Sequence, residues 1–348
     1  VYDYAPGSNT TTSDSLFAKL TYNINQNMSV SFSALDSSID GTQSAGMADL
    51  LRTTSTDQSR YRLNFNWIIG ELGVLELKWG QQKSEFVSMP VNGTEVASRY
   101  ITTTAWSYAN RSRWDEQTEK RTDWAAKFTG YLDTETLGSH EFSIGLEYEE
   151  FETQWLLGHT SGGEQVMYDD EFPWMESAAF NMKYETNAEG QIILGPDGNP
   201  IITPRFLTQY NHQWNDNQVK NQGIFIQDRI TYGNWTFMLG LRADKNKVYP
   251  VAGGDALWTW DFSDYLVPRI SVIYDLFGDQ NHIFKFAYGE FKDATTTRVA
   301  EFFAPEGGNT YVQYEWVGPT GPTETQLHDP SNWEYYWDQT PHMDFNED

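Results

Sequence analysis

The sequence contains no cysteine among its 348 residues, which excludes disulfide bonds, zinc–thiolate sites and thiol nucleophiles. It also lacks any continuous apolar run near the roughly 18–20 residues that a transmembrane helix requires, so a helical membrane protein is excluded. Basic residues are scarce: 23 Lys and Arg stand against 49 Asp and Glu, and the formal net charge is −26. Because a phosphate backbone requires a basic footprint, no nucleic acid partner is expected.

Catalytic and targeting motifs are missing too. The chain has no Gly-x-Ser-x-Gly elbow, P-loop, His-Glu-x-x-His motif or twelve-residue calcium loop, so we expect neither an enzyme nor a bound metal or cofactor. No apolar leader follows Val1, and the chain stops at Asp348 without a closing strand. We therefore expect an internal segment of a longer protein, in which residues 1–348 form one partial barrel domain.

The most informative pattern that is present is alternation with a period of two residues. Ser29, Ser31 and Ser33 alternate with apolar residues between positions 28 and 34. Such alternation predicts strands with one apolar and one polar face. Five hairpins follow from it, each with a short turn, at about 15–36, 59–82, 121–151, 220–245 and 266–291.

The connections between these hairpins are long, at roughly 37–58, 85–120, 152–219, 246–265 and 292–348. Short turns that alternate with long loops are typical of an outer-membrane barrel with short periplasmic turns and long extracellular loops. The predicted strands have about ten residues, which crosses a bilayer at the usual tilt. The fold class expected is therefore all-β: a transmembrane, antiparallel, up-and-down β-barrel segment of about ten strands. Aromatic residues near the strand ends fit interface girdles: Trp67, Trp79, Trp124, Tyr148, Trp235 and Tyr274.

Charged residues occupy the polar positions of these strands, which indicates a wide aqueous lumen, because a barrel of eight to ten strands fills its interior with side chains. The cations expected to face the lumen are Arg62, Lys78, Lys127, Arg242 and Arg269. They could contact a plug domain or an anionic substrate, or form salt bridges within the wall. Asp228 breaks the pattern, because it shares a face with Ile224 and Ile226; a β-bulge or an early exit from the apolar band would each explain it.

Several runs resemble one known family. Residues 222–229 (QGIFIQDR) and 235–242 (WTFMLGLR) resemble a recurrent hairpin of TonB-dependent outer-membrane receptors. Residues 268–271 (PRIS), 274–279 (YDLFGD) and 286–289 (FAYG) resemble the next hairpin of that family, and residues 139–149 (SHEFSIGLEYE) are similar to its Oar-like branch, which carries a carboxypeptidase-regulatory-like domain.

This resemblance implies about ten strands of a 22-stranded barrel with an N-terminal plug, from which the plug domain and the closing strands are absent. It implies TonB-dependent import of a scarce nutrient across the outer membrane of a Gram-negative bacterium. The implied partners are outer-membrane lipid and lipopolysaccharide, the TonB complex, the plug domain and an unknown nutrient ligand.

Tryptophans of the long connections are the candidate ligand-binding residues, because exposed aromatic rings can stack on sugars or anchor a protein partner. They are Trp106, Trp114, Trp155, Trp174, Trp258, Trp260, Trp316, Trp333 and Trp337. Packing of the loops onto one another is the alternative role. Two alternative functions stay open from the sequence: a passive porin or export-system barrel, and a soluble secreted glycan-binding β-protein.

Overall fold

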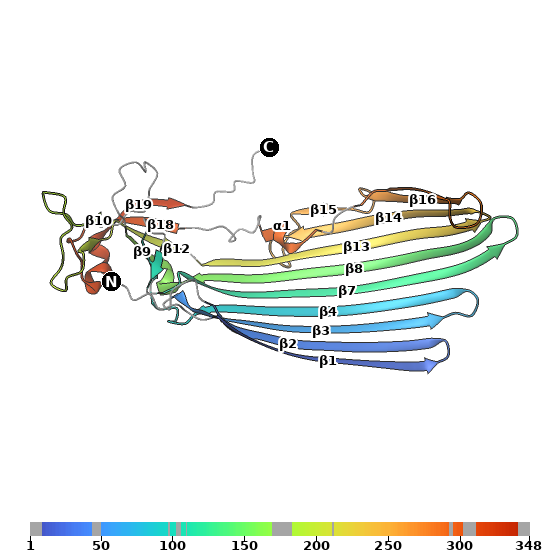
Figure 1. Ribbon diagram of the computed structural model, residues 1–348, viewed down its shortest axis with the longest axis horizontal. Helices are drawn as coiled ribbons and strands as arrows, with labels where there is room; N and C mark the ends of the chain where they lie inside the picture. The colour runs from blue at the N-terminus through green and yellow to red at the C-terminus, as the bar shows by residue number, and fades with distance from the viewer. Residues whose placement is uncertain are drawn as a thin grey trace.

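The computed structural model describes residues 9–43, 50–96, 98–101, 106–108, 110–168, 183–210, 212–291, 295–301 and 311–339. Its main feature is one antiparallel sheet of long, consecutive hairpins (Figure 1). The strands follow one another in the order β1 (Thr10–Asn25), β2 (Met28–Gln43), β3 (Arg52–Ile68), β4 (Gly73–Pro90), β7 (Arg113–Thr134), β8 (Gly138–His159), β13 (Gln213–Tyr232), β14 (Trp235–Tyr249), β16 (Leu266–Asp275) and β17 (Ile283–Gly289). A short strand, β15 (Trp258–Trp260), pairs with β14. The predicted all-β, up-and-down arrangement is confirmed.

The short turns lie at one end of the sheet and the long connections at the other (Figure 1). One of these turns requires glycine. Gly138, at the β7–β8 turn, has a φ of +86°, and a Cβ there would lie 2.2 Å from the carbonyl oxygen of Thr231. Only glycine tolerates both the positive φ and this close approach to β13.

The strands are longer than predicted. The eight strands β1 to β4, β7, β8, β13 and β14 have 15–22 residues, whereas apolar alternation predicted about ten. The difference lies mostly toward the long connections, where charged and polar residues occupy both faces. Backbone ladders do not need apolar side chains, so pairing continues after the amphipathic pattern ends.

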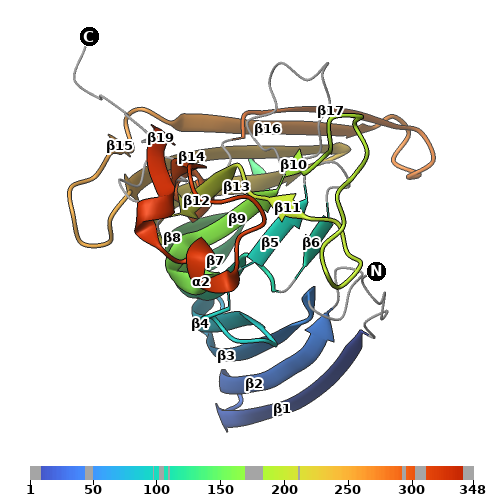
Figure 2. The ribbon, with the colours of Figure 1, turned by 90° about the vertical axis from the view of Figure 1, so that its left-hand side faces the viewer.

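The register gives the sheet two chemically distinct faces. Leu20, Phe32, Leu63 and Trp79 follow one another directly across β1 to β4 on what we call the apolar face. The opposite face, called the polar face below, carries the charged residues. Figure 2 shows the sheet curved into an open trough.

Asp228 stays on the apolar face. The register of β13 runs without a shift against both β8 and β14, so the bulge alternative is wrong. Its carboxylate Oδ2 lies 2.8 Å from Nδ1 of His140, two residues after the β7–β8 turn glycine Gly138. A neighbouring histidine near the turn end therefore pairs with one oxygen of this acid, whereas the buried Oδ1 has no hydrogen-bond partner among the described residues.

A second sheet forms at the end with the long connections, which we call the outer sheet (Figures 1 and 2). Its six strands are ordered β19 (Trp333–Gln339), β18 (Tyr311–Trp316), β12 (Phe206–Tyr210), β9 (Glu164–Tyr168), β5 (Ser98–Ile101) and β6 (Trp106–Tyr108). Alternation in the sequence predicted only long connections for these segments. They have three to seven residues each, and their partners come from distant connections, so no local alternation reveals them.

The smaller elements also belong to the long connections. They are β10 (Lys183–Tyr184) with β11 (Ile202–Thr203), the helices α1 (Thr297–Glu301) and α2 (Glu324–Leu327), and the 3-10 turns η2 (Thr160–Gly163) and η3 (Pro330–Asn332). Within the described residues, no helix has the length and apolarity required to cross a membrane.

Buried apolar side chains lie mainly at the end of the molecule with the long connections. Phe206, in the outer sheet, is 1% exposed, and Val219, Val248 and Ala300 form a fully buried cluster beneath α1. On the apolar face, by contrast, Leu20 and Ile226 are 68% and 56% exposed. A whole face of exposed aliphatic side chains needs a non-aqueous neighbour.

Candidate functional site

The polar face of β7, β8, β13, β14 and β16 forms the candidate site. Strand pairing aligns Arg62, Asp123, Glu149, Asn221 and Asn246 along one continuous row across the sheet. Because successive side chains of a strand alternate between faces, residues two positions away in each strand form the neighbouring rows of the same face. The rows bring together charged residues from hairpins that are distant in sequence.

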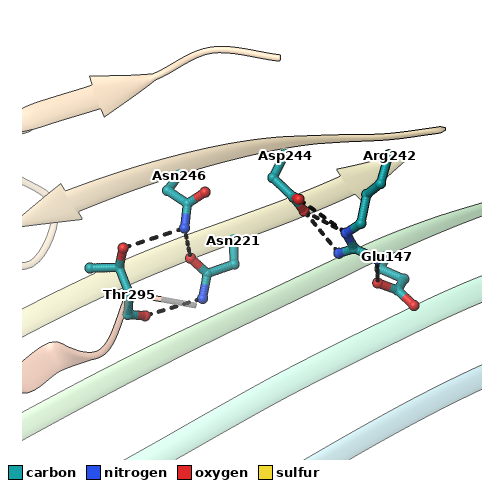
Figure 3. A network of polar contacts seen from close by, with 6 residues as sticks. All are labelled: Glu147, Asn221, Arg242, Asp244, Asn246 and Thr295. Atoms are coloured by element: carbon teal, nitrogen blue, oxygen red, sulfur yellow. Dashed lines mark hydrogen bonds and ion pairs between the residues drawn. The ribbon is translucent and has the colours of Figure 1, made fainter. Parts of the chain in front are cut away.

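Arg242 is the centre of this network (Figure 3). Its Nε donates to both carboxylate oxygens of Asp244, at 2.9 and 3.0 Å, and its Nη1 donates to Oε2 of Glu147 at 2.7 Å. Glu147 belongs to β8, whereas Arg242 belongs to β14, so the arginine reaches across the intervening strand β13. Gly223 makes this possible, because a Cβ there would lie 2.4 Å from Nη2 of Arg242.

A second arginine repeats this arrangement one hairpin earlier. Arg121 of β7 forms an ion pair with Glu149 of β8, and its Nε lies 3.7 Å from Oδ1 of Asp123. Its guanidinium also lies 5.3 Å from the centre of the Phe151 ring, within the range of a cation–π interaction. Each arginine therefore has two carboxylates beside it, and the wall holds its charges in place through its own contacts.

These residues line a pocket of about 400 Å³ on the polar face. Arg121, Glu147, Asn221, Arg242, Asp244 and Arg269 contribute to its walls. Arg269 differs from the other two arginines: within the described residues its guanidinium forms no ion pair and lies 4.9 Å from the ring centre of Phe291. The pocket thus combines neutralised ion pairs with one cation that has no carboxylate partner.

The five cations predicted to face the lumen all lie on the polar face, but only two of them, Arg242 and Arg269, line the pocket. Lys78 and Lys127 lie 3.7 and 3.9 Å from the carboxylate of Glu76. Arg62 is exposed and has no hydrogen-bond or ion-pair partner among the described residues.

The candidate tryptophans mostly lie on strands rather than in loops, and several pack against other rings. Trp316 and Trp333 contact edge to face at 4.8 Å, and Trp258 and Trp260 lie 5.7 Å apart. Trp114, at the end of β7, lies 5.9 Å from the His212 ring.

Of the four remaining candidate tryptophans, the structure describes the side chains of two, Trp337 and Trp155. Trp337 on β19 is 46% exposed and contacts Tyr311 with its edge. Trp155 is half-buried at the end of β8. Trp106 lies on β6, but its side chain is outside the description, and Trp174 lies outside the described residues altogether. Among the described tryptophans, Trp258 with Trp260 and Trp316 with Trp333 form Trp–Trp pairs, and these two pairs belong to different sheets.

Where the main sheet meets the outer sheet, burial changes the acidity of several groups. His159 is 6% exposed and stacks on Tyr210 at 4.6 Å. Burial lowers the pKa of His159 to about 4, and the charges of Arg113 and His212 lower it further. A hydrogen bond with the backbone of Ser112 acts in the opposite direction and raises the pKa. Burial likewise raises the pKa of Tyr210. His159 is therefore neutral at physiological pH.

The carboxylates and amides of the site were not singled out from the sequence. Glu147, Glu149, Asn221, Asp244 and Asn246 stand at polar positions of the predicted strands, so alternation assigned their face. Sequence alone does not show which of them become cross-strand neighbours, because this depends on the register. Within the described residues, no three His, Asp or Glu side chains gather closely enough to hold a metal ion.

Comparison with known proteins identifies the family of this chain. The family model described as TonB dependent receptor-like, beta-barrel, matches residues 2–332. Among solved structures, the outer membrane transporter YddB from Escherichia coli is similar with a TM-score of 0.56 and 11% identity, over 88% of this chain and 37% of that chain. FpvA of P. aeruginosa, solved with bound heterologous pyoverdines, gives a TM-score of 0.49 and 11% identity, over 94% and 45% of the two chains.

The chain thus spans less than half the length of these solved structures. A comparison with curated proteins finds no match. At 11% identity the likeness to YddB concerns the fold alone, whereas the family model covers nearly the whole chain. The chain belongs to the TonB-dependent receptor-like β-barrel family and lies in the outer membrane of a Gram-negative bacterium.

Proposed function

We propose that the receptor containing this chain imports a scarce nutrient across the outer membrane, with energy delivered by the TonB complex. The observation that carries the proposal is the pairing of an exposed aliphatic face with a charged face on one continuous sheet of a TonB-dependent receptor barrel. The apolar face meets lipid, and the polar face meets an aqueous interior. Antiparallel strands with this alternation are the wall of a membrane barrel.

The rest of the barrel comes from other parts of the receptor. In the described chain, β1 and β17 each pair along one edge only. An open sheet edge does not persist in hydrocarbon, because its backbone groups would lack partners. Further strands of the receptor therefore pair with both edges, and a plug domain fills the resulting lumen, as in the 22-stranded transporters. The similarity of residues 139–149 to the Oar-like branch supports a receptor of that branch.

The polar face contacts the plug domain or the passing ligand. Arg242 and Arg121 are neutralised by the wall's own carboxylates, so they stiffen the wall. Arg269 and Arg62 are exposed and have no carboxylate partner among the described residues. These two cations therefore suit a contact with an acidic group of the plug or of an anionic ligand.

The outer sheet captures the ligand on the extracellular side, above the lipopolysaccharide. Its edge strand β19 carries Tyr335, Tyr336 and Trp337, which are 64%, 52% and 46% exposed. Large rings that are already ordered by the sheet bind with little loss of side-chain entropy. Trp316 and Trp333 of the same sheet support this surface, because their rings contact edge to face.

The test compares uptake with and without TonB. Cells expressing the full-length receptor, in TonB-containing and TonB-deficient backgrounds, would receive a radiolabelled ferric siderophore, an oligopeptide mixture and an oligosaccharide mixture. We expect uptake of one class, and only in the cells with TonB. Equal uptake in both backgrounds would support a passive pore instead, and no uptake of any class above that of receptor-free cells would contradict import.

A matched pair of variants examines the polar face. Arg269→Gln removes the unpaired cation beside the pocket, whereas Arg229→Gln removes a polar-face arginine close to the β13–β14 turn, 3.9 Å from Glu141. We expect the first to reduce TonB-dependent uptake and the second to leave it unchanged. Equal effects of both would refute a specific role for Arg269.

A further inference from the structure

Residues 295–301, called the inner segment below, lie against the polar face instead of projecting from the barrel. Thr295 begins the segment, and its two oxygens are held by two strands (Figure 3). Asn221 of β13 donates from Nδ2 to the Thr295 carbonyl at 3.2 Å, and Asn246 of β14 donates from Nδ2 to the Thr295 hydroxyl at 3.4 Å. Asn246 also donates to Oδ1 of Asn221 at 2.7 Å.

The rest of the inner segment continues this contact. The Thr297 hydroxyl accepts from the hydroxyl of Thr153 on β8 at 2.8 Å. Ala300 is fully buried against Val219 and Val248, and Trp258 packs on the same cluster. Helix α1 thereby contacts β8, β13 and β14. Side-chain hydrogen bonds therefore hold the start of the inner segment on the polar face, and burial of Ala300 holds its end.

The inner segment adjoins open space. A second pocket, of about 290 Å³, is lined by Thr296 and Thr297 on one side and by Arg121, Phe151 and Thr153 on the other. Arg121 and its neighbours also line the larger pocket that contains Arg242. Asn221 and Asn246 already line the larger pocket, so removing the inner segment would free their amides and extend that space toward the second pocket.

The groups that hold Thr295 are complementary to a peptide. One amide donates to a backbone carbonyl and the adjacent amide donates to a hydroxyl, and neither contact belongs to a strand ladder. A side-chain amide carries two donors and an acceptor, which suits peptide carbonyls and hydroxyl side chains. The wall thus recognises an irregular peptide, and here that peptide is part of the same chain.

We infer that Asn221, Asn246 and Thr153 form a peptide-binding subsite on the polar face, which the chain's own residues Thr295–Thr297 occupy in this structure. The subsite accepts a peptide with hydroxyl side chains once the inner segment moves away. This inference rests on the proposed function, because an arriving ligand is what competes with the segment. It adds two points to the proposed function: the ligand is a peptide, and its binding requires displacement of the inner segment.

The experiment uses the full-length receptor in detergent micelles and a capped hexapeptide, acetyl-Thr-Thr-Thr-Arg-Val-Ala-amide, which copies residues 295–300. In one variant a Gly-Ser linker of equal length replaces residues 295–301. We expect saturation-transfer NMR to detect the peptide on this linker variant, with affinity at least about tenfold higher than on the wild type, whose own segment competes at high effective concentration.

Two further variants in the linker background locate the binding. Asn221→Ala with Asn246→Ala should weaken peptide binding by about tenfold or more, since each net hydrogen bond contributes roughly fivefold. The matched control Asn64→Ala removes another polar-face amide, which bonds to Ser31 at 3.3 Å, and should leave binding unchanged. The peptide acetyl-Ala-Ala-Ala-Arg-Val-Ala-amide, which lacks the hydroxyls, should also bind more weakly.

Absence of binding to a folded linker variant would overturn the subsite, as would binding that survives loss of both amides. Heat-modifiable migration in gels verifies that each variant is a folded barrel. If peptide binding fails while TonB-dependent uptake persists, the subsite is wrong and the importer stands. If the peptide binds but no ligand is taken up with TonB, the proposed import is wrong and the subsite stands.

Discussion

Acidification should loosen the outer sheet through His159. This side chain is 6% exposed, stacks on Tyr210 of β12, and receives the repulsion of Arg113 and His212. Its pKa in the folded protein is about 4, against 6.5 for an exposed histidine. Protonation therefore places a charge at a buried position beside the like charges of Arg113 and His212.

Whether stability rises or falls with pH depends on which state, folded or unfolded, binds more protons. Between pH 6.5 and about 4 the unfolded state binds the proton and the folded state does not, so stability falls as the pH falls through this range. The fall in pKa from 6.5 to about 4, at about 1.4 kcal/mol per pKa unit, gives a maximum loss of about 3.5 kcal/mol. Most of this loss is reached at about pH 4.5, and almost none is present at about pH 7.5.

Hydrogen exchange monitored by mass spectrometry measures this loss locally. Peptides from β9 and β12 should exchange through local opening about 50- to 100-fold more readily at pH 4.5 than at pH 7.5, after correction for intrinsic rates. His159→Phe keeps a ring against Tyr210 without a titrating group, and should remove most of the difference. His212→Gln tests the neighbouring histidine. An unchanged pH dependence in His159→Phe would refute the assignment.

Three further predictions concern packing, backbone and membrane position. Phe206→Ala should destabilise the outer sheet by about 3–5 kcal/mol, detected as proteolysis confined to that sheet; cleavage throughout the barrel would contradict its independence. Gly138→Ala meets the Thr231 carbonyl at 2.2 Å, whereas Gly233→Ala, with a φ of +54°, meets no atom within 4 Å; the first should lower the urea midpoint of refolding far more than the second, and equal shifts would contradict the contact. Ile144→Lys, near the middle of the apolar band of β8, should cost about 2–4 kcal/mol of folding free energy in lipid vesicles, and Leu156→Lys on the same face but beyond the Tyr148 level should cost about 0–1 kcal/mol; equal costs would contradict this membrane position.

Most of the main sheet could be predicted from sequence because its information is local. A period of two residues and glycine- or asparagine-containing turns fix strands and hairpins, and consecutive hairpins in a barrel pair with their neighbours. The outer sheet could not be predicted from the sequence, because its strands pair across long separations. β12 lies between β9 and β18, and residues 206–210 pair with residues around 165 and 313. Nothing in five residues of sequence identifies such partners.

The candidate site could likewise be predicted only in part from the sequence. Alternation placed Arg242 and Glu147 on one face, but the bridge between them also requires Gly223, whose missing side chain leaves room for the guanidinium. A gap on an intervening strand has no signature in the sequence of either partner. The inner segment was equally invisible, because Thr295 contacts strands that end about 50 and 60 residues earlier.

The surplus strand length decides where the polar face opens to the outside. β7 and β8 have 22 residues each, whereas a tilted strand crosses a bilayer with about 9–11, so about 12 residues, or about 40 Å of strand, extend beyond it. Trp124 and Tyr148 lie side by side on the apolar face with ring centres 5.7 Å apart.

The next apolar-face positions along β8 are Glu150 and Glu152, paired with Lys220 and Lys120. An aromatic row followed directly by ion pairs is where a membrane interface ends. Asn221 pairs with Glu149, at this same level. The inner segment therefore lies against the polar face at the level of the outer membrane boundary, where the proposed ligand would enter the lumen.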